Sequence, residues 1–113
     1  MVTNPKYVIK KSTNGQFYWV LNAVNGEPIL KSSETYVSKQ GCQTSIASSK
    51  VTVADGNFKR LISLNRQYYF NQVAGNGLIL GISEMYNTSA ACENGIAAVK
   101  RDAPKANVED TTI

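Results

Sequence analysis

The chain contains the same pattern twice, and this repeat constrains its fold more than any other feature. An Asn-Gly pair, an Ile-Leu pair, a Ser-Glu-x-Tyr segment, a cysteine, an Ile-Ala pair and a lysine recur in the same order in residues 25–50 and 76–100. The spacing is 51 residues before, and 50 residues after, a one-residue deletion that we place where Glu-Pro-Ile-Leu becomes Leu-Ile-Leu. A repeat of this period indicates two similar supersecondary units that share one hydrophobic core.

Each unit has the pattern of three strands joined by tight turns. Short runs of alternating residues, rich in aromatic and β-branched side chains, are typical of strands that bury one face. Asn-Gly pairs at Asn14, Asn25 and Asn76 supply the positive φ that tight hairpins require, and Asn65 with Arg66 takes the corresponding place in the second unit. The expected strands are residues 7–12, 16–23 and 29–32 in the first unit, and 58–63, 67–75 and 78–82 in the second.

A helix is expected after the third strand of each unit. Ser38 and Thr88 are typical N-cap residues, since their hydroxyls can accept a hydrogen bond from an N–H of the first turn. We expect the helices to run from Ser38 to about Val51, and from Thr88 to a point before Pro104. Their inner faces are expected to be Cys42, Ile46 and Ser49 in the first helix and Cys92, Ile96 and Val99 in the second.

Two positions weaken the expected core. Ser49 stands where the second helix has Val99, so the first helix should pack less well on the sheet. Gln72 stands where the first unit has Leu21, which puts an amide on the core face. An unpaired buried amide costs about 1–3 kcal/mol, so we expect this amide either to find a backbone partner or to lie at a strand end that is open to water.

Together the two units predict one α+β domain over residues 1–113, made of repeats at about 6–55 and 57–113. Side by side, they would form one longer antiparallel sheet with both helices packed on the same face. The C-terminal residues 108–112 align with residues 58–62 at a spacing of 50. A frayed terminus is the alternative there, but the phase of the repeat favours a short edge strand.

The repeated motif also resembles that of a known family. The motif is N-G-x-x-I-L-x-S-S-E-x-Y followed by C-x-x-x-I-A-x-x-K, and its second copy ends in C-E-N-G-I-A-A-V-K-R-D-A-P. Over about residues 7–112 it is similar to the YegP-like family, which consists of small, mostly bacterial proteins of unknown function. The resemblance implies tandem β(3)-α-β units in a single sheet, with C-terminal strands exchanged between units. It also implies a monomer that resembles a fused dimer, because family members with one repeat dimerise.

Composition limits the chemistry that the chain can carry out. It has no histidine, which removes the commonest general base and the commonest zinc ligand, and it has no CxxC pair. We therefore expect no catalytic residue, no metal and no cofactor. Cys42 and Cys92 occupy the same position in the two copies and are expected to be small buried thiols, with a disulfide between the repeats as the alternative.

Charge and hydropathy set expectations for partners and location. The excess of 12 Lys and Arg over 8 Asp and Glu is small and lacks a dense basic run, so it permits a nucleic-acid partner without requiring one. No apolar run approaches the roughly 20 residues of a membrane helix. No signal peptide is visible, so we expect a cytoplasmic protein without membrane contact.

Glu34 and Glu84 are the only acidic residues kept in both copies. As an enzyme pair they would need a separation of about 5–10 Å and one raised pKa, and nothing in the sequence brings them together. The alternative is that the Ser-Glu-x-Tyr segment shapes the connection from strand to helix, with Tyr36 and Tyr86 packed against the sheet. We favour this structural interpretation over a small-molecule enzyme.

The remaining candidate is the sheet face opposite the helices. Tyrosines and lysines on a bare sheet resemble platforms on which single-stranded bases stack, although Tyr and Val are also favoured on ordinary exposed strands. We expect a small non-enzymatic binding domain that uses this face or a sheet edge, for a protein partner or single-stranded nucleic acid. An accessory protein without a discrete site is the alternative. The candidate binding residues are Lys10, Tyr18, Val20, Asn22, Lys59, Tyr69, Asn71 and Val73.

Overall fold

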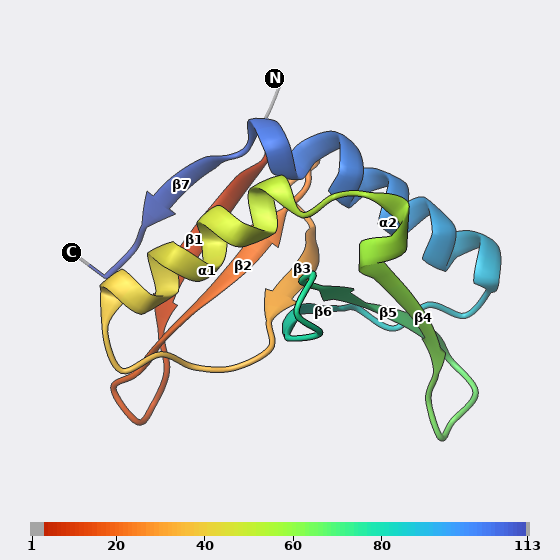
Figure 1. Ribbon diagram of the computed structural model, residues 1–113, viewed down its shortest axis with the longest axis horizontal. Helices are drawn as coiled ribbons and strands as arrows, with labels where there is room; N and C mark the ends of the chain where they lie inside the picture. The colour runs from red at the N-terminus through yellow and green to blue at the C-terminus, as the bar shows by residue number, and fades with distance from the viewer. Residues whose placement is uncertain (1–3, 113) are drawn as a thin grey trace.

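The structure is a computed structural model that describes residues 4–112, and it has the expected α+β architecture. One seven-stranded sheet carries both long helices on a single face (Figure 1). The strands are β1 (Lys6–Lys11), β2 (Phe17–Asn22), β3 (Pro28–Ser32), β4 (Phe58–Ile62), β5 (Tyr68–Val73), β6 (Ile79–Ser83) and β7 (Asn107–Asp110). The helices are α1 (Lys39–Val51) and α2 (Ser89–Asp102), with short 3-10 helices η1 (Asp55–Asn57) and η2 (Ala103–Lys105) before β4 and β7.

The local signals in the sequence produce the elements that they predict. Ser38 Oγ accepts a hydrogen bond from the N–H of Gly41 at 3.1 Å, and Thr88 Oγ1 accepts one from the N–H of Ala91 at 3.0 Å. The turn at Asn65 places Arg66 at a φ of 64°, where the other three tight turns place glycine. Every predicted strand and helix lies within two residues of an observed one.

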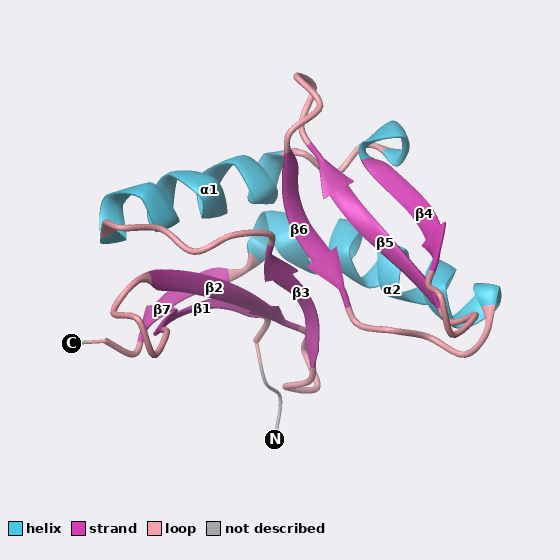
Figure 2. Ribbon diagram, turned by 90° about the horizontal axis from the view of Figure 1, so that it is seen from below, coloured by secondary structure: helices cyan, strands magenta, loops and turns pink. Residues whose placement is uncertain are grey.

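The strand order is β4-β5-β6-β3-β2-β1-β7, so the two repeats meet at the antiparallel pair of β3 and β6. The last strand of the second repeat, β7, pairs with β1 of the first repeat. This pairing confirms both the edge strand and the exchange that the family resemblance implied. It is parallel, with Tyr7 opposite Val108, so the sheet is antiparallel except at this end. Figure 2 shows that the strands of the two halves run in clearly different directions, as in a strongly twisted sheet.

Equivalent hydrogen bonds in the two repeats show that the one-residue deletion does not lie in or before the third strand. The N–H of Trp19 donates to Ser32 Oγ at 3.3 Å, and the N–H of Phe70 donates to Ser83 Oγ at 2.9 Å. Trp19 and Phe70 are 51 residues apart, and so are Ser32 and Ser83. The spacing of 51 therefore persists to the end of β6.

The deletion lies in the connector that follows β6. Phe17 exchanges backbone hydrogen bonds with Tyr36, and Tyr68 exchanges them with Tyr86. The first members of these pairs are 51 residues apart and the second members are 50 apart, so one residue is lost between Ser83 and Tyr86. Our placement from the sequence was wrong, because it matched two identical Ile-Leu pairs that do not occupy equivalent positions.

As a consequence, Leu30 of β3 is equivalent to Gly81 of β6. A Cβ at Gly81 would lie 2.8 Å from Leu30 Cγ and 3.0 Å from the Trp19 ring. Leu30 is almost fully buried and fills this space from one side only. The centre of the sheet therefore has room for one leucine, not for two related by symmetry.

A buried chain of polar side chains joins the two repeats. The Tyr7 hydroxyl and Ser49 Oγ lie 2.7 Å apart, and Ser49 Oγ donates to Gln72 Oε1 at 2.6 Å. The Gln72 amide also donates to the carbonyls of Ser49 and Thr52 at 2.9 and 2.8 Å. The predicted partner for the Gln72 amide thus exists, and Ser49 is a fully buried link between α1 and β5 rather than a gap.

The two cysteines are buried and neither forms a disulfide, which confirms the interpretation as thiols and rules out the bridge between repeats. Burial raises the pKa of Cys42 to about 11, and burial also raises the pKa of Cys92. Both thiols are therefore neutral at physiological pH and act as small apolar residues under the helices.

Candidate functional site

The two ends of the sheet differ in whether a strand covers them. At the β1 end, the N–H of Asn107 donates to the carbonyl of Pro5 at 3.3 Å, and the N–H of Thr111 donates to the carbonyl of Ile9 at 3.1 Å. Ion pairs reinforce this cover, with Lys6 Nζ 3.7 Å from Glu109 and Lys39 Nζ 2.9 Å from Asp110. The covered Ile9 is fully buried.

The opposite end of the sheet is the outer edge of β4, where no strand among residues 4–112 pairs. By the spacing of 51, Phe58 and Arg60 correspond to Tyr7 and Ile9. The N–H of Ser63 donates to Gln67 across the hairpin, so the alternation of the ladder turns the backbone groups of Phe58, Arg60 and Ile62 away from β5. The backbone groups of Arg60 and Ile62 therefore face outward without a strand beside them, whereas the N–H of Phe58 donates to the carbonyl of Asp55 in η1.

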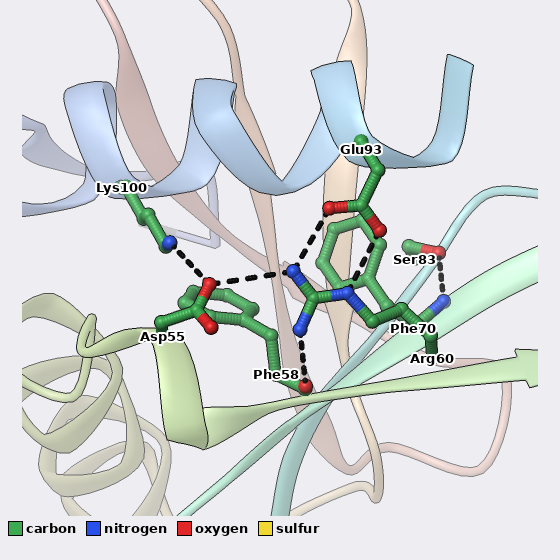
Figure 3. A network of polar contacts seen from close by, with 7 residues as sticks. All are labelled: Asp55, Phe58, Arg60, Phe70, Ser83, Glu93 and Lys100. Carbon is green, nitrogen blue, oxygen red and sulfur yellow. Dashed lines mark hydrogen bonds and ion pairs between the residues drawn. The ribbon is translucent and has the colours of Figure 1, made fainter. Parts of the chain in front are cut away.

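The side chain of Arg60 lies at this edge, and Figure 3 shows its contacts with Glu93, Asp55 and Phe58. Its guanidinium forms two hydrogen bonds with the Glu93 carboxylate of α2, at 2.8 and 2.9 Å, and reaches Asp55 at 3.3 Å. Its Nη1 donates to the backbone carbonyl of Phe58 at 3.2 Å. Lys100 Nζ lies 2.7 Å from Asp55 and completes the cluster.

The cluster perturbs the carboxylates that it contains. The hydrogen bond from Arg60 lowers the pKa of Glu93, and the hydrogen bonds from Lys100 and then Arg60 lower the pKa of Asp55. Both acids are therefore ionised at physiological pH, and the cluster holds two cations and two anions. A charged side chain that points inward at an open edge is one of the ways in which natural sheets limit unwanted strand pairing.

An apolar groove of about 550 Å³ lies beside Arg60, between the edge of β4 and the start of α2. In the first repeat, Lys11 and Lys39 each place Nζ 5.7 Å from the centre of the Phe17 ring. The second repeat has Ile62 and Ser89 at these two positions, so the equivalent ring of Tyr68 has no such cover. The groove is lined by Arg60, Leu61, Ile62, Tyr68, Ser89, Cys92 and Glu93.

The sheet face opposite the helices is less open than the sequence predicted. Of the eight candidate residues, only Lys10 and Lys59 are exposed. Asn71 is buried, and its Oδ1 has no hydrogen-bond partner. The other five are half-buried: Tyr18, Val20, Asn22, Tyr69 and Val73. Strands β3 and β6 separate the residues of β2 from those of β5, so the two halves of the candidate set do not touch across the sheet.

The two glutamates kept in both repeats come closer than we expected from the sequence. Glu34 and Glu84 both line one cavity of about 370 Å³ beside Tyr18 and Lys31, at the junction of β3 and β6. Both side chains are exposed. Glu84 also borders a second cavity, of about 800 Å³, between the β2–β3 turn and α2. As predicted, Tyr36 and Tyr86 pack against the core from the connectors.

Among residues 4–112, no group of three or more Cys, Asp and Glu side chains is placed to hold a metal ion. No helix in this part of the chain is both long enough and apolar enough to cross a bilayer.

The open edge of β4 is the feature that sequence reasoning missed. A signal for it was present, because the spacing of 51 puts Arg60 where the first repeat has Ile9 on the core face. A charge at a predicted core position indicates that the position is not covered. The groove itself depends on Ser89 and Cys92, which the sequence does not connect with β4.

Comparisons with known proteins agree with this architecture. A family model described as a domain of unknown function, DUF1508, matches residues 12–59 and again residues 64–110. The UPF0339 protein YegP of Escherichia coli K12 is 38% identical over 107 residues, which is 94% of this chain and 96% of the relative. A UPF0339 protein of Bordetella pertussis is 42% identical over the same shares of both chains.

Solved structures agree as well. The solution NMR structure of yegP from E. coli, titled a protein of unknown function, has a TM-score of 0.88 at 36% identity, over 98% of this chain and 96% of that one. The solution NMR structure of a UPF0339 protein from Shewanella oneidensis has a TM-score of 0.87 at 36% identity, over 96% and 92%. The chain therefore belongs to the DUF1508 family, as a two-repeat member that is similar to UPF0339 proteins of the YegP type.

Proposed function

We propose that this protein is a non-enzymatic interaction domain that adds an extended segment of a partner protein to the outer edge of β4. The observation that carries the proposal is the contrast between the two ends of the sheet. Backbone groups that pair with β7 on β1 have no strand beside them on β4, where the N–H and the carbonyl of Phe58 are held by Asp55 and by the Arg60 side chain. Strand addition to an exposed edge is a common mode of peptide recognition, in which main-chain hydrogen bonds give affinity and side-chain pockets give specificity.

The surroundings of the edge support this function. The groove beside β4 supplies a pocket for a partner's side chain. Ile62 is 65% exposed, and Leu64 in the following turn is fully exposed. Apolar side chains of this size that remain exposed beside an unpaired strand mark an interaction surface.

A peptide-display selection with one matched pair of variants tests the proposal. Peptides selected on the wild-type protein should bind an Ile62→Pro variant at least about tenfold more weakly, since proline removes an edge N–H without touching the ladder to β5. Lys11→Pro is the matched control, because it makes the same change at the equivalent position beside β7. Selected peptides that bind both variants equally well, or a library that yields no binder, would contradict this function.

A second candidate is single-stranded nucleic acid on the face opposite the helices. It is favoured by Lys31 Nζ, which lies 5.1 Å from the centre of the Tyr18 ring, and by Lys10, which is the cross-strand neighbour of Tyr18. Bases stack on such cation-flanked rings, and the binding should weaken steeply with salt. NMR titration with short oligonucleotides tests this, and amides near Tyr18 and Tyr69 that do not shift at low salt would exclude it.

We also propose that the protein acts in the cytoplasm as a monomer. The fused arrangement of the two repeats supports the monomer, because the exchanged strand β7 and its acceptor β1 belong to one chain. Light scattering coupled to size-exclusion chromatography checks the mass in solution. A dimer at micromolar concentration would contradict the proposal.

A further inference from the structure

We propose that the segment bound at β4 is acidic, runs parallel to β4, and carries an apolar side chain two residues after its carboxylates. This inference rests on the function proposed above and specifies its partner. The template is β7, because the structure already holds one extended segment against the equivalent edge. Each residue of the bound segment is named after the β7 residue whose position it would take; the Asp110 position, for example, is the one opposite Arg60.

Direction and register follow from the β1 end. The N–H groups of Asn107 and Thr111 donate to carbonyls four residues apart, at Pro5 and Ile9. A parallel ladder has evenly spaced bonds, so the N–H of Glu109 faces the carbonyl of Tyr7 midway between them. On β4 the equivalent carbonyl is that of Phe58, which Arg60 Nη1 already contacts, while the N–H of Phe58 donates to the carbonyl of Asp55 in η1.

Arg60 can therefore exchange one acceptor for another when the segment arrives. The segment's N–H at the Glu109 position takes over the carbonyl of Phe58, and Nη1 of Arg60 becomes available to a new acceptor. The next residue, at the Asp110 position, lies beside Arg60 on the helix side of the sheet. A carboxylate there receives charge-assisted hydrogen bonds while Glu93 keeps its own pair with Arg60.

The residue before it is also expected to be acidic. At the Glu109 position the segment lies beside Lys59, which is exposed on the opposite face. Opposite charges on neighbouring strands attract, and like charges repel. Two adjacent carboxylates therefore match Lys59 and Arg60, as Glu109 and Asp110 match Lys6 and Lys39 at the other end.

The groove sets the position of the apolar side chain. β7 ends at Asp110, and the N–H of Thr112 turns back to the Asp110 carboxylate, so the bound segment is proposed to stay extended for two residues longer than β7. Continued in the same register, its residue at the Thr112 position lies beside Ile62, on the same side as the groove next to Tyr68 and Cys92. In the first repeat this space is covered by Lys11 and Lys39. An apolar side chain at the Thr112 position would fill the groove that the second repeat leaves open.

A second copy of this chain fits the edge less well. Two β4 edges paired with each other in an antiparallel arrangement would bring Lys59 and Arg60 of both copies together. Like charges on adjacent strands oppose such pairing. A self-associating edge is nevertheless a measurable outcome of the experiment below.

The test uses the intact protein, labelled with ¹⁵N, and synthetic peptides based on residues 106–112. The first peptide carries Thr112→Leu, the second adds Glu109→Gln and Asp110→Asn, and the third keeps Thr112. Amide shifts report the site, since Arg60 and Ile62 lie on β4 whereas Tyr7 and Ile9 lie under β7. A spin label at the peptide's N-terminus reports direction, because a parallel segment starts beside Asn57 and an antiparallel one beside Ser63.

We expect the first peptide to shift β4 amides, with broadening near Asn57, at a Kd of about 1 mM or below. The neutral peptide should bind about five- to tenfold more weakly, and the peptide that keeps Thr112 should also bind more weakly. Arg60→Gln should reduce the difference between acidic and neutral peptides, and Arg60→Gln combined with Lys59→Gln should abolish it. Lys105→Ala, which removes an exposed cation of η2 that is not part of the Arg60 cluster, should preserve it.

Equal binding of acidic and neutral peptides at β4, or broadening near Ser63, overturns this inference and leaves the proposed function standing. Shifts of β4 amides with protein concentration alone, together with a dimer mass, overturn it in favour of a second copy. If no peptide shifts β4 while the display selection still yields binders that Ile62→Pro weakens, only the acidic motif is wrong. If both fail, the proposed function fails with it.

Discussion

The two ends of the sheet are built from one repeated sequence, yet they end in different ways. At the β1 end, Ile9 points toward the helices and is fully buried beneath β7. At the β4 end, the equivalent Arg60 has a side chain that is 40% exposed and forms an ion pair with Glu93. The signals for strands and turns are repeated in both halves. The residue that points toward the helices from the outer strand is apolar where β7 covers that strand and charged where no strand covers it.

The contacts between helix and sheet differ in a second way. On one side of the sheet centre, Tyr7, Ser49 and Gln72 form a hydrogen-bonded chain. The equivalent residues on the other side are Phe58, Val99 and Leu21, which are all apolar and buried. The same backbone arrangement thus holds either three hydrogen-bonded side chains or three apolar ones. A mixture of polar and apolar residues at these three positions would leave a buried polar group without a partner. A change at one member should therefore be costly, and a change of all three should not.

The largest expected effect compares the equivalent residues Ile9 and Arg60. Ile9→Ala should lower the free energy of unfolding by about 2–5 kcal/mol, because it leaves a cavity beneath β7. Arg60→Ala should lower it by less than about 1 kcal/mol, since its ion pairs are partly exposed to solvent. Urea unfolding of the two variants measures both. Equal losses would mean that the two ends are equally covered.

Ser49→Val tests the polar chain. It should cost about 1–3 kcal/mol, because it leaves the Tyr7 hydroxyl and Gln72 Oε1 without the partner that they share. The triple variant Tyr7→Phe, Ser49→Val, Gln72→Leu copies the apolar set and should recover most of this loss. Unfolding in urea again gives the comparison. A triple variant that is less stable than Ser49→Val alone would show that the set is not interchangeable.

Gly81→Ala tests the single leucine at the centre of the sheet. The added methyl group would meet Leu30 and Trp19 and should cost about 1–3 kcal/mol. In a Leu30→Ala background the same substitution should cost much less, since the colliding atoms are gone. A double-mutant cycle measures this coupling. Additive effects would indicate that the two residues do not compete for one space.

The smallest effect concerns Asp110 of β7. Hydrogen bonds from Thr112 and an ion pair with Lys39 lower the pKa of its carboxyl to about 2. A lowered pKa means that the stabilisation is fully present above the unfolded pKa of about 4 and is lost as the pH falls toward 2. Thr112→Val should raise the pKa of Asp110, and NMR titration of the carboxyl carbon measures it. An unchanged value would show that Thr112 is not the main cause.

The repeat predicted most of the fold. Each strand and helix was expected from its own turn and cap residues, and the edge strand β7 was expected from the phase of the repeat. The position of the deletion was wrong because the sequence alignment matched the identical pairs Ile29-Leu30 and Ile79-Leu80. The structurally equivalent positions are instead those with the same hydrogen bonds, such as Ser32 and Ser83. Two identical residues in the repeats need not occupy equivalent positions, because the hydrogen-bonded pairing of the strands determines which positions are equivalent in the sheet.

The candidate site was only partly predictable. The eight residues on the helix-free face follow from strand alternation, but alternation does not predict that Asn71 is buried between β4 and β6. The cluster at Arg60 combines η1, β4 and α2, which are brought together only by the complete fold. Sequence reasoning could have marked Arg60 as an anomaly on a core face. It could not have supplied Glu93 as its partner.

The position of β4 in the chain explains why the sheet has seven strands. In this chain, β4 is both the strand that follows α1 and the first strand of the second repeat, so two repeats give seven strands and not eight. Two separate chains of one repeat each, exchanging their last strands, would have a covering strand at both ends. Joining the units in one polypeptide removes one of these strands, and it does so whatever the side chains are. The uncovered edge at β4 is thus a consequence of joining two repeats in one polypeptide, and a tandem chain with the same strand order should have it on the same side.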